Sequence, residues 1–250
     1  MTAGIVRDVV HFGGQFLDLP FAAATQVSES IANRPEEGVM GFGLASGARM
    51  GLPPIVDLLA LSGLIPERVT GWKLSRGEDG KNDGELVLGG VNTAKFVPGS
   101  MITVKNLDAF HWRVQVDAAS VNNVRVMDSP RTAILDTGAL HILTTFQDAA
   151  MLHTFIPGTV VTITGQYLLP CNNQAVLSLS IGKVFWRIDA RDLVNAPVPP
   201  EARLRNYCFS SIQPHPARQS GEWLVGSTFL KNVYMKLDSG ANTIGIAALR

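Results

Sequence analysis

A ten-residue segment, Arg131-Thr-Ala-Ile-Leu-Asp-Thr-Gly-Ala-Leu140, constrains the fold more than any other part of the chain. Its apolar residues predict a buried strand, which leads directly into the carboxylate of Asp136 and a small turn at Gly138. This pattern places an acid at the end of a buried strand, where the backbone cannot easily move. The segment therefore predicts a rigid carboxylate site. The alternative is an ordinary aspartate in a turn, because three-residue motifs recur by chance.

The composition is that of a strand-rich globular protein. A chain of 250 residues suits one large domain or two smaller ones. With 24 glycines and 14 prolines, strands and turns are favoured over a helical bundle. The 21 basic and 21 acidic residues balance, so neither nucleic acid nor a membrane is expected as a partner. No apolar run is long enough to span a bilayer, and the segment 1–8 does not read as a signal peptide.

Several segments have the two-residue alternation of half-buried strands. In the segment 111–117, Trp112, Val114 and Val116 share one face. Further strands are predicted over 84–90, over 175–188 as a hairpin that turns at Gly182 and Lys183, and over 233–247 as a hairpin that turns at 238–242. These short strands predict an all-β protein with minor helix.

Two helices are predicted from their end signals. The first, over 54–62, starts at Pro54 and has Gly63 just past its end. The second, over 146–155, opens on an approximate capping box of Thr145 and Asp148. The segments 76–84 and 195–201 are expected to be surface connectors, because both are rich in turn residues.

Cysteine and histidine usage bears on disulfides, metals and cofactors. Cys171 and Cys208, 37 positions apart, are either two buried thiols or a disulfide, which would contribute about 4 kcal/mol on the chain-entropy model. There is no Cys-x-x-Cys, and the five histidines lack ligand spacing, so no metal site is expected. The segment 41–46 approaches a dinucleotide fingerprint but lacks its third glycine, and no cofactor is expected.

Four features in order resemble the pepsin-like aspartic proteases of family A1. The strand of Trp112 comes first, the Asp-Thr-Gly of Asp136 follows, and the cysteine pair lies before Leu224-Val-Gly226. The last segment is similar to the family's hydrophobic-hydrophobic-Gly strand, which closes a loop around the Asp-Thr-Gly. The resemblance covers nearly all of 105–250. It implies a pepsin-like fold in which residues 101–250 form a complete carboxy-terminal lobe, and it implies the Cys171–Cys208 disulfide.

The first hundred residues resemble the family less closely. The segment 38–44 is similar to the family's Asp-Gly-Ile-Leu-Gly-Leu-Gly stretch, with Glu37 in place of the aspartate, and the segment 1–6 aligns with the strand after the flap. The chain is therefore expected to begin inside the amino-terminal lobe, without roughly the first quarter of a family member. Residues 1–100 would be a remnant of that lobe and the crossover. We expect them to be loose, aggregation-prone or completed by another chain.

The resemblance also implies roles for individual residues. Asp136 would be a catalytic carboxylate, and Gly138 would let its own N–H approach that acid. The full set is Asp136 as catalytic residue, Thr137, Gly138 and Ala139 as active-site support, and Ile134, Gly138, Ala139 and Leu224 as the lining for apolar substrate side chains. Pepsin-like members usually carry Ser or Thr where this chain has Ala139.

Peptide hydrolysis in this family is known to use two carboxylates that share one proton around a bound water. The chain contains Asp-Thr-Gly only once, so the resemblance implies an aspartic endopeptidase that is inert as a single 250-residue chain. Two other hypotheses remain open. One is a non-catalytic module that grips extended peptides, and the other is a homodimer that pairs two Asp136 residues, as retroviral enzymes do. Each has a peptide or protein as its partner, and the family suggests secretion or a vacuole.

Overall fold

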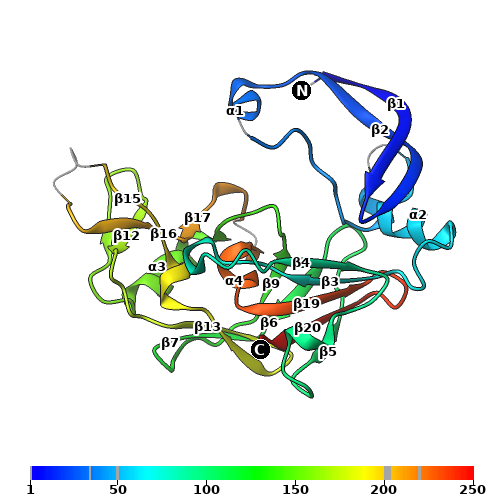
Figure 1. Ribbon diagram of the computed structural model, residues 1–250. Helices are drawn as coiled ribbons and strands as arrows, with labels where there is room; N and C mark the ends of the chain where they lie inside the picture. Colours follow the sequence, from blue (N-terminus) through cyan, green and yellow to red (C-terminus); the bar gives the residue numbers. More distant parts are fainter. Residues whose placement is uncertain (1, 34, 49–50, 200–203, 219–220) are drawn as a thin grey trace.

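The computed structural model describes residues 2–33, 35–48, 51–199, 204–218 and 221–250. These residues fold mainly into strands, with a few short helices between them (Figure 1). The prediction of an all-β protein with minor helix is confirmed. Among the described residues, the helices are too short or too polar to cross a bilayer.

The segment of Asp136 lies in a five-stranded sheet at the centre of the body (Figure 1). Its order is β17 (Ile212–Pro214), β10 (Ile142–Thr144), β18 (Glu222–Val225), β9 (Arg131–Leu135) and β6 (Arg113–Val116). Strand β9 pairs with β18 in parallel and with β6 in antiparallel. Because β9 has a neighbour on each side, its carboxyl end is held from both directions.

Two four-stranded sheets complete this part of the molecule. One has the order β11 (Val160–Val161), β12 (Tyr167–Pro170), β16 (Tyr207–Ser210) and β15 (Val194–Pro197), and the other β14 (Val184–Arg187), β13 (Leu177–Ile181), β7 (Ala118–Val121) and β8 (Val124–Met127). Cys171, just after β12, is disulfide-bonded to Cys208 in β16, and their Cα atoms are 5.0 Å apart. The disulfide that the family resemblance implied is therefore present.

A second five-stranded sheet combines strands from the first part of the chain with the last two strands. Its order is β4 (Glu85–Leu88), β3 (Val69–Lys73), β19 (Val233–Asp238), β20 (Thr243–Ala248) and β5 (Ile102–Lys105). Between β3 and β4, the guanidinium of Arg76 donates hydrogen bonds to the buried carboxylate of Asp192, with Nη2 at 2.7 Å. The segment 69–88 is thus attached to the carboxy-terminal part by backbone pairing and by an ion pair.

Residues 2–26 form a hairpin that projects from the body beside α2 (Figure 1). Strands β1 (Thr2–Phe12) and β2 (Gln15–Gln26) pair only with each other among the described residues, and apolar side chains such as Phe16 are exposed. The hairpin is attached through a small core that Leu17 forms with Ile55, Val56, Leu59 and Ile65 around α2 (Ile55–Leu61). After α1 (Glu29–Ala32), the segment 35–44 is extended and mostly exposed.

The local predictions agree with the structure at their decisive residues. Trp112, Val114 and Val116 are all buried in the main core. Helix α3 (Phe146–Thr154) begins where the side-chain oxygen of Thr145 accepts the N–H of Asp148 at 3.0 Å. Both predicted hairpins are present, as β13–β14 and β19–β20.

One of the two predicted connectors differs from expectation. Part of the segment 195–201 lies in β15, because its backbone pairs with the edge of β16; positions 200 and 201 lie outside the described residues. The segment 76–84 is a mostly exposed connector, as predicted, and Arg76 at its start is paired with Asp192.

Candidate active site

Asp136 directly follows β9 and is fixed by two hydrogen bonds. Its backbone N–H donates to the carbonyl oxygen of Val225 in β18 at 3.1 Å. Its Oδ1 accepts the N–H of Gly138 at 2.8 Å, which closes the small turn. The residue is half-buried, and the backbone holds one oxygen of its carboxylate. This geometry suits a carboxylate that acts on a bound molecule without moving.

The segment after β18 closes the loop around this turn. The N–H of Gly226 donates to the carbonyl oxygen of His141 at 3.0 Å, and the N–H of Ser227 donates to that of Ala139 at 2.8 Å. A Cβ on residue 226 would overlap the carbonyl oxygen of Ala139 and lie 2.8 Å from that of His141. Only glycine fits at this position, and the segments 136–141 and 224–228 pack directly against each other.

A buried carboxylate joins the starts of the two strands that carry the site. Asp148 in α3 is 1% exposed and accepts hydrogen bonds from Nε and Nη2 of Arg131, at the start of β9, both at 2.8 Å. It also accepts the indole N–H of Trp223, in β18, at 2.8 Å. Burial alone would raise the pKa of Asp148, but these hydrogen bonds and the charge of Arg131 outweigh burial and lower it. Asp148 therefore stays anionic and keeps β9 and β18 in register.

The residues that the sequence assigned to the site lie together at one end of β9 and β18. Leu224 pairs in register with Ile134, two residues before Asp136. Ile134 is only 8% exposed, whereas Leu224 is half-buried. Thr137 and Gly138 are exposed at the turn, and Ala139 is half-buried beside them.

The sequence analysis missed His111. Arg113 pairs with Ile134, and the N–H of Leu135 donates to the carbonyl oxygen of Trp112 at 2.8 Å. Continued by one residue, this antiparallel register brings His111 level with Asp136 on the same face of the sheet. The alternation of 111–117 places His111 on the face opposite Trp112. Only the pairing with β9 shows that this face carries Asp136.

His141 also went unnoticed. Its Nδ1 is buried and has no hydrogen-bond partner among the described residues, and burial lowers the pKa of the ring. Its backbone carbonyl contributes to the loop closure described above. His141 therefore contributes to the site through its backbone carbonyl.

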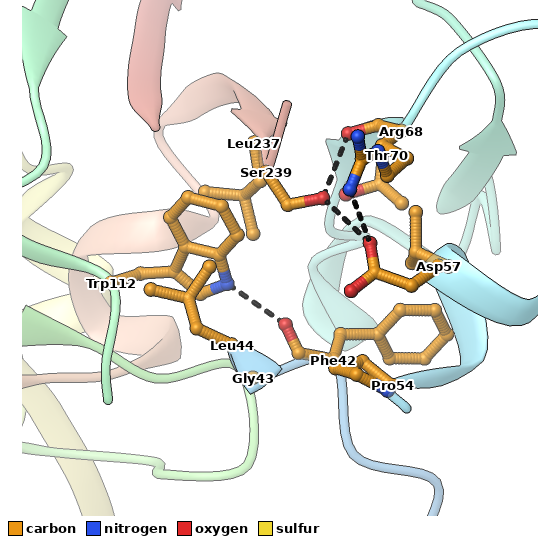
Figure 2. A pocket seen from close by; sticks show the side chains of 11 residues that line it. Phe42, Gly43, Leu44, Pro54, Asp57, Arg68, Thr70, Trp112, Leu237 and Ser239 are labelled. Atoms are coloured by element: carbon orange, nitrogen blue, oxygen red, sulfur yellow. Dashed lines mark hydrogen bonds and ion pairs between the residues drawn. The ribbon is translucent and has the colours of Figure 1, made fainter. Parts of the chain in front are cut away.

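A small cavity, separate from the site, is lined by Trp112 and by residues around Phe42 and Asp57 (Figure 2). Figure 2 shows the indole of Trp112 pointing to the carbonyl oxygen of Phe42, to which its Nε1 donates a hydrogen bond at 2.8 Å. On the other wall, the hydroxyl of Ser239 donates to Oδ1 of Asp57 at 3.3 Å. None of the residues assigned to the site lines this cavity. These contacts tie Phe42 and Asp57 to the body.

Within the described ranges, His, Cys, Asp and Glu side chains do not gather in groups of three or more that could hold a metal ion. What the site offers chemically is therefore a fixed carboxylate, exposed backbone at the turn, and neighbouring apolar side chains. Such a set can orient a water or a carbonyl group through hydrogen bonds.

Comparison with known proteins adds an independent finding. Residues 1–249 match the family described as eukaryotic aspartyl protease. Aspartic-type endopeptidase ctsD of Aspergillus fumigatus is 31% identical over 99% of this chain and 51% of its own length. A probable aspartic-type endopeptidase CTSD of Arthroderma otae is 31% identical over 98% of this chain and 63% of its own. Mouse napsin-A is 28% identical over 84% of this chain and 50% of its own. The chain thus spans between half and two thirds of the length of these relatives, and it belongs to the eukaryotic aspartyl protease family.

Proposed function

We propose that this chain supplies one half of an aspartic endopeptidase site, with Asp136 as its catalytic carboxylate. The observation that carries the proposal is the closed loop in which Asp136 donates its N–H to Val225 and accepts that of Gly138. In this proposal Thr137, Gly138 and Ala139 support the carboxylate, as the family membership suggests. A carboxylate held this rigidly can act as base on a water molecule at little reorganisation cost.

We further propose that the 250-residue polypeptide is inert by itself. Hydrolysis in this family needs a second acid, which stays protonated and donates a hydrogen bond to the scissile carbonyl. The only hydrogen bond recorded for the Asp136 carboxylate within the described residues comes from Gly138, and the sequence has one Asp-Thr-Gly. A lone carboxylate lacks the like charge that would keep a proton shared between two acids.

The same geometry supports binding of an extended peptide. Leu224 is half-buried and Leu140 is exposed, so an apolar surface flanks Asp136 on the β18 side. In this proposal Ile134, Gly138, Ala139 and Leu224 line the position of an apolar substrate side chain. Residues 101–250 would form the carboxy-terminal lobe, and residues 1–100 a remnant of the other lobe. Because β3 and β4 lie in a sheet with β19 and β20, the segment 69–88 would be structurally part of the carboxy-terminal lobe.

Two alternatives have the same site but different chemistry. A non-catalytic peptide-binding module would use only the apolar surface beside Asp136. A homodimer would bring two Asp136 residues together, and the half-exposed carboxylate at the end of β9 is compatible with that. The projecting hairpin of β1 and β2 would have to stay clear of the second copy. The disulfide is consistent with a secreted or vacuolar protein, which is our proposal for the compartment.

A peptidase assay at acidic pH separates these possibilities. The chain and its Asp136→Asn variant are incubated with a protein substrate, with and without pepstatin, at a pH where circular dichroism shows both to be folded. We expect no hydrolysis by the monomer above the level of the variant. Pepstatin-sensitive hydrolysis that is linear in protein concentration and lost in Asp136→Asn would refute the inert monomer. Hydrolysis that rises with the square of concentration would support the homodimer.

A further inference from the structure

A row of four charged side chains crosses β9, because Arg113 in β6 is paired with Glu222 in β18. We call Asp108, Arg113, Glu222 and Arg218 the charged row. Nη2 of Arg113 lies 2.9 Å from Oδ2 of Asp108 and 2.6 Å from Oε1 of Glu222. Nη1 of Arg218 donates to Oε2 of Glu222 at 2.7 Å. The two acids and two bases of the row neutralise one another.

His111 stands at one end of the charged row and is the exposed polar side chain level with Asp136. Its Nδ1 lies 3.0 Å from Oδ2 of Asp108, and its side chain is 56% exposed. Oδ1 of Asp108 accepts the N–H of Phe110 at 3.1 Å. Burial alone would raise the pKa of Asp108, but the hydrogen bonds from His111 and Phe110 and the charge of Arg113 lower it. Asp108 thus orients the imidazole, and its own oxygens are occupied.

Nε2 of His111 is left for a partner outside the chain. Among the described residues, this nitrogen has no hydrogen-bond partner, whereas Nδ1 is bound to Asp108. Leu224 on β18 is level with Ile134, and His111 next to β6 is level with Asp136. With neighbouring strands about 4.8 Å apart and residues about 3.3 Å apart along a strand, the two side chains are roughly 12 Å from each other, on opposite sides of the strand that leads to Asp136. The site is therefore apolar on one side of Asp136 and polar on the other.

An extended peptide that crosses Asp136 would bring side chains to both sides, since alternate side chains are roughly 7 Å apart. An acidic side chain next to His111 would meet the carboxylate of Asp108, and the neighbouring Arg113 is already paired with Asp108 and Glu222. A basic one would meet Arg113, and it would find the oxygens of Asp108 already taken. A carboxamide avoids both conflicts because it is neutral. It can also donate a hydrogen bond to Nε2 when this nitrogen carries no proton, and accept one when it does.

We propose that His111 is a specificity-determining residue whose free ring nitrogen takes a carboxamide side chain, Gln or Asn, of the bound peptide on the β6 side of Asp136. This inference rests on the proposed peptide-binding function. It assigns to one side of the site a preference that the apolar lining around Leu224 does not predict.

Binding of labelled peptides tests the proposal without needing hydrolysis. The probes are fluorescein-labelled heptapeptides with a central Phe-Phe in which the peptide bond is reduced. In each, one flanking position carries either Gln or Leu, and the exchange is repeated at every flanking position. Fluorescence anisotropy measures the dissociation constant for the natural chain, for His111→Phe and for His111→Asn. Circular dichroism and melting temperature check that the variants fold alike.

We expect one flanking position at which Gln binds the natural chain roughly 3- to 10-fold more tightly than Leu, the value of one net hydrogen bond. His111→Phe should lose this preference, and His111→Asn should recover part of it. The proposal is overturned if no position prefers Gln in the natural chain, or if the preference survives in His111→Phe. If none of the peptides binds, the proposed peptide-binding function fails as well, which distinguishes that outcome from binding without preference.

Discussion

Acidification should destabilise this protein through one buried histidine. His153, in α3, is 2% exposed. Its Nδ1 lies 2.7 Å from the carbonyl oxygen of Ala149, and its Nε2 lies 2.8 Å from Oγ of Ser210. That Oγ accepts the N–H of Ile212 at 3.1 Å, so its own proton is free to point at Nε2. The pattern is satisfied by a neutral ring with its proton on Nδ1.

The magnitude follows from the burial of this ring. Burial lowers the pKa of His153 from 6.5 to about 4, although the hydrogen bond with Ala149 acts in the opposite direction. Because the pKa of the folded state is depressed, the contribution of His153 to stability is complete above pH 6.5 and is lost as the pH falls through 4. At 1.36 kcal/mol per pKa unit, the unfolding free energy should drop by about 3 kcal/mol between pH 7.5 and pH 4. A typical domain has a total of only about 5–15 kcal/mol.

Urea unfolding at pH 7.5, 6, 5 and 4 measures this loss. The natural chain is compared with His153→Gln, which cannot take up a proton, and with His215→Gln, which changes an exposed histidine. Subtracting the variant removes the contribution of all other titrating groups. We expect the advantage of the natural chain over His153→Gln to shrink by about 3 kcal/mol from pH 7.5 to pH 4. If the unfolding free energies of the natural chain and His153→Gln run parallel across this pH range, the reasoning is refuted. The control variant His215→Gln should run parallel to the natural chain.

Three further predictions concern the loop at Gly226, the disulfide and the exposed segment 35–44. Gly226→Ala should lower the melting temperature steeply, because the new methyl group overlaps a carbonyl oxygen, whereas Gly77→Ala, with open space around its Cβ, should change it little; equal effects would contradict the close packing of the loop. Replacing both Cys171 and Cys208 by alanine should reduce the unfolding free energy by about 4 kcal/mol in urea titrations, and an unchanged midpoint would argue against a constraining disulfide. Limited proteolysis with mass-spectrometric mapping should find the first cuts in the exposed, extended segment 35–44, and first cuts in β3 or β4 would show that these strands are not protected by their sheet.

Local structure could be predicted because its causes are local. The capping of α3 by Thr145 depends on a side chain and an N–H three residues apart. The turn of the β13–β14 hairpin depends on Gly182 and Lys183, both of which have positive φ. The burial of Trp112 and its two alternating neighbours follows from the period of a strand. Fold class and helix positions came from patterns of this kind.

The candidate site needed the family resemblance as well as the local pattern. The strand before Asp136 was evident from its apolar residues, but nothing local connects it to Leu224. Their proximity depends on the parallel pairing of β9 and β18, which are far apart in the chain. The resemblance supplied that connection, because the two motifs occur together in a known family.

Tertiary structure alone decided the charged and buried polar contacts. Trp223 reaches Asp148 across 75 positions, and Arg76 reaches Asp192 across 116. His111 became part of the site only when the register of β6 against β9 was known. The physical reason is that periodicity records which face of a strand is buried, whereas the order and register of strands in a sheet determine which remote side chains meet. The sequence by itself therefore determined the fold class and the carboxylate of Asp136, and the packed sheet decided what surrounds that carboxylate.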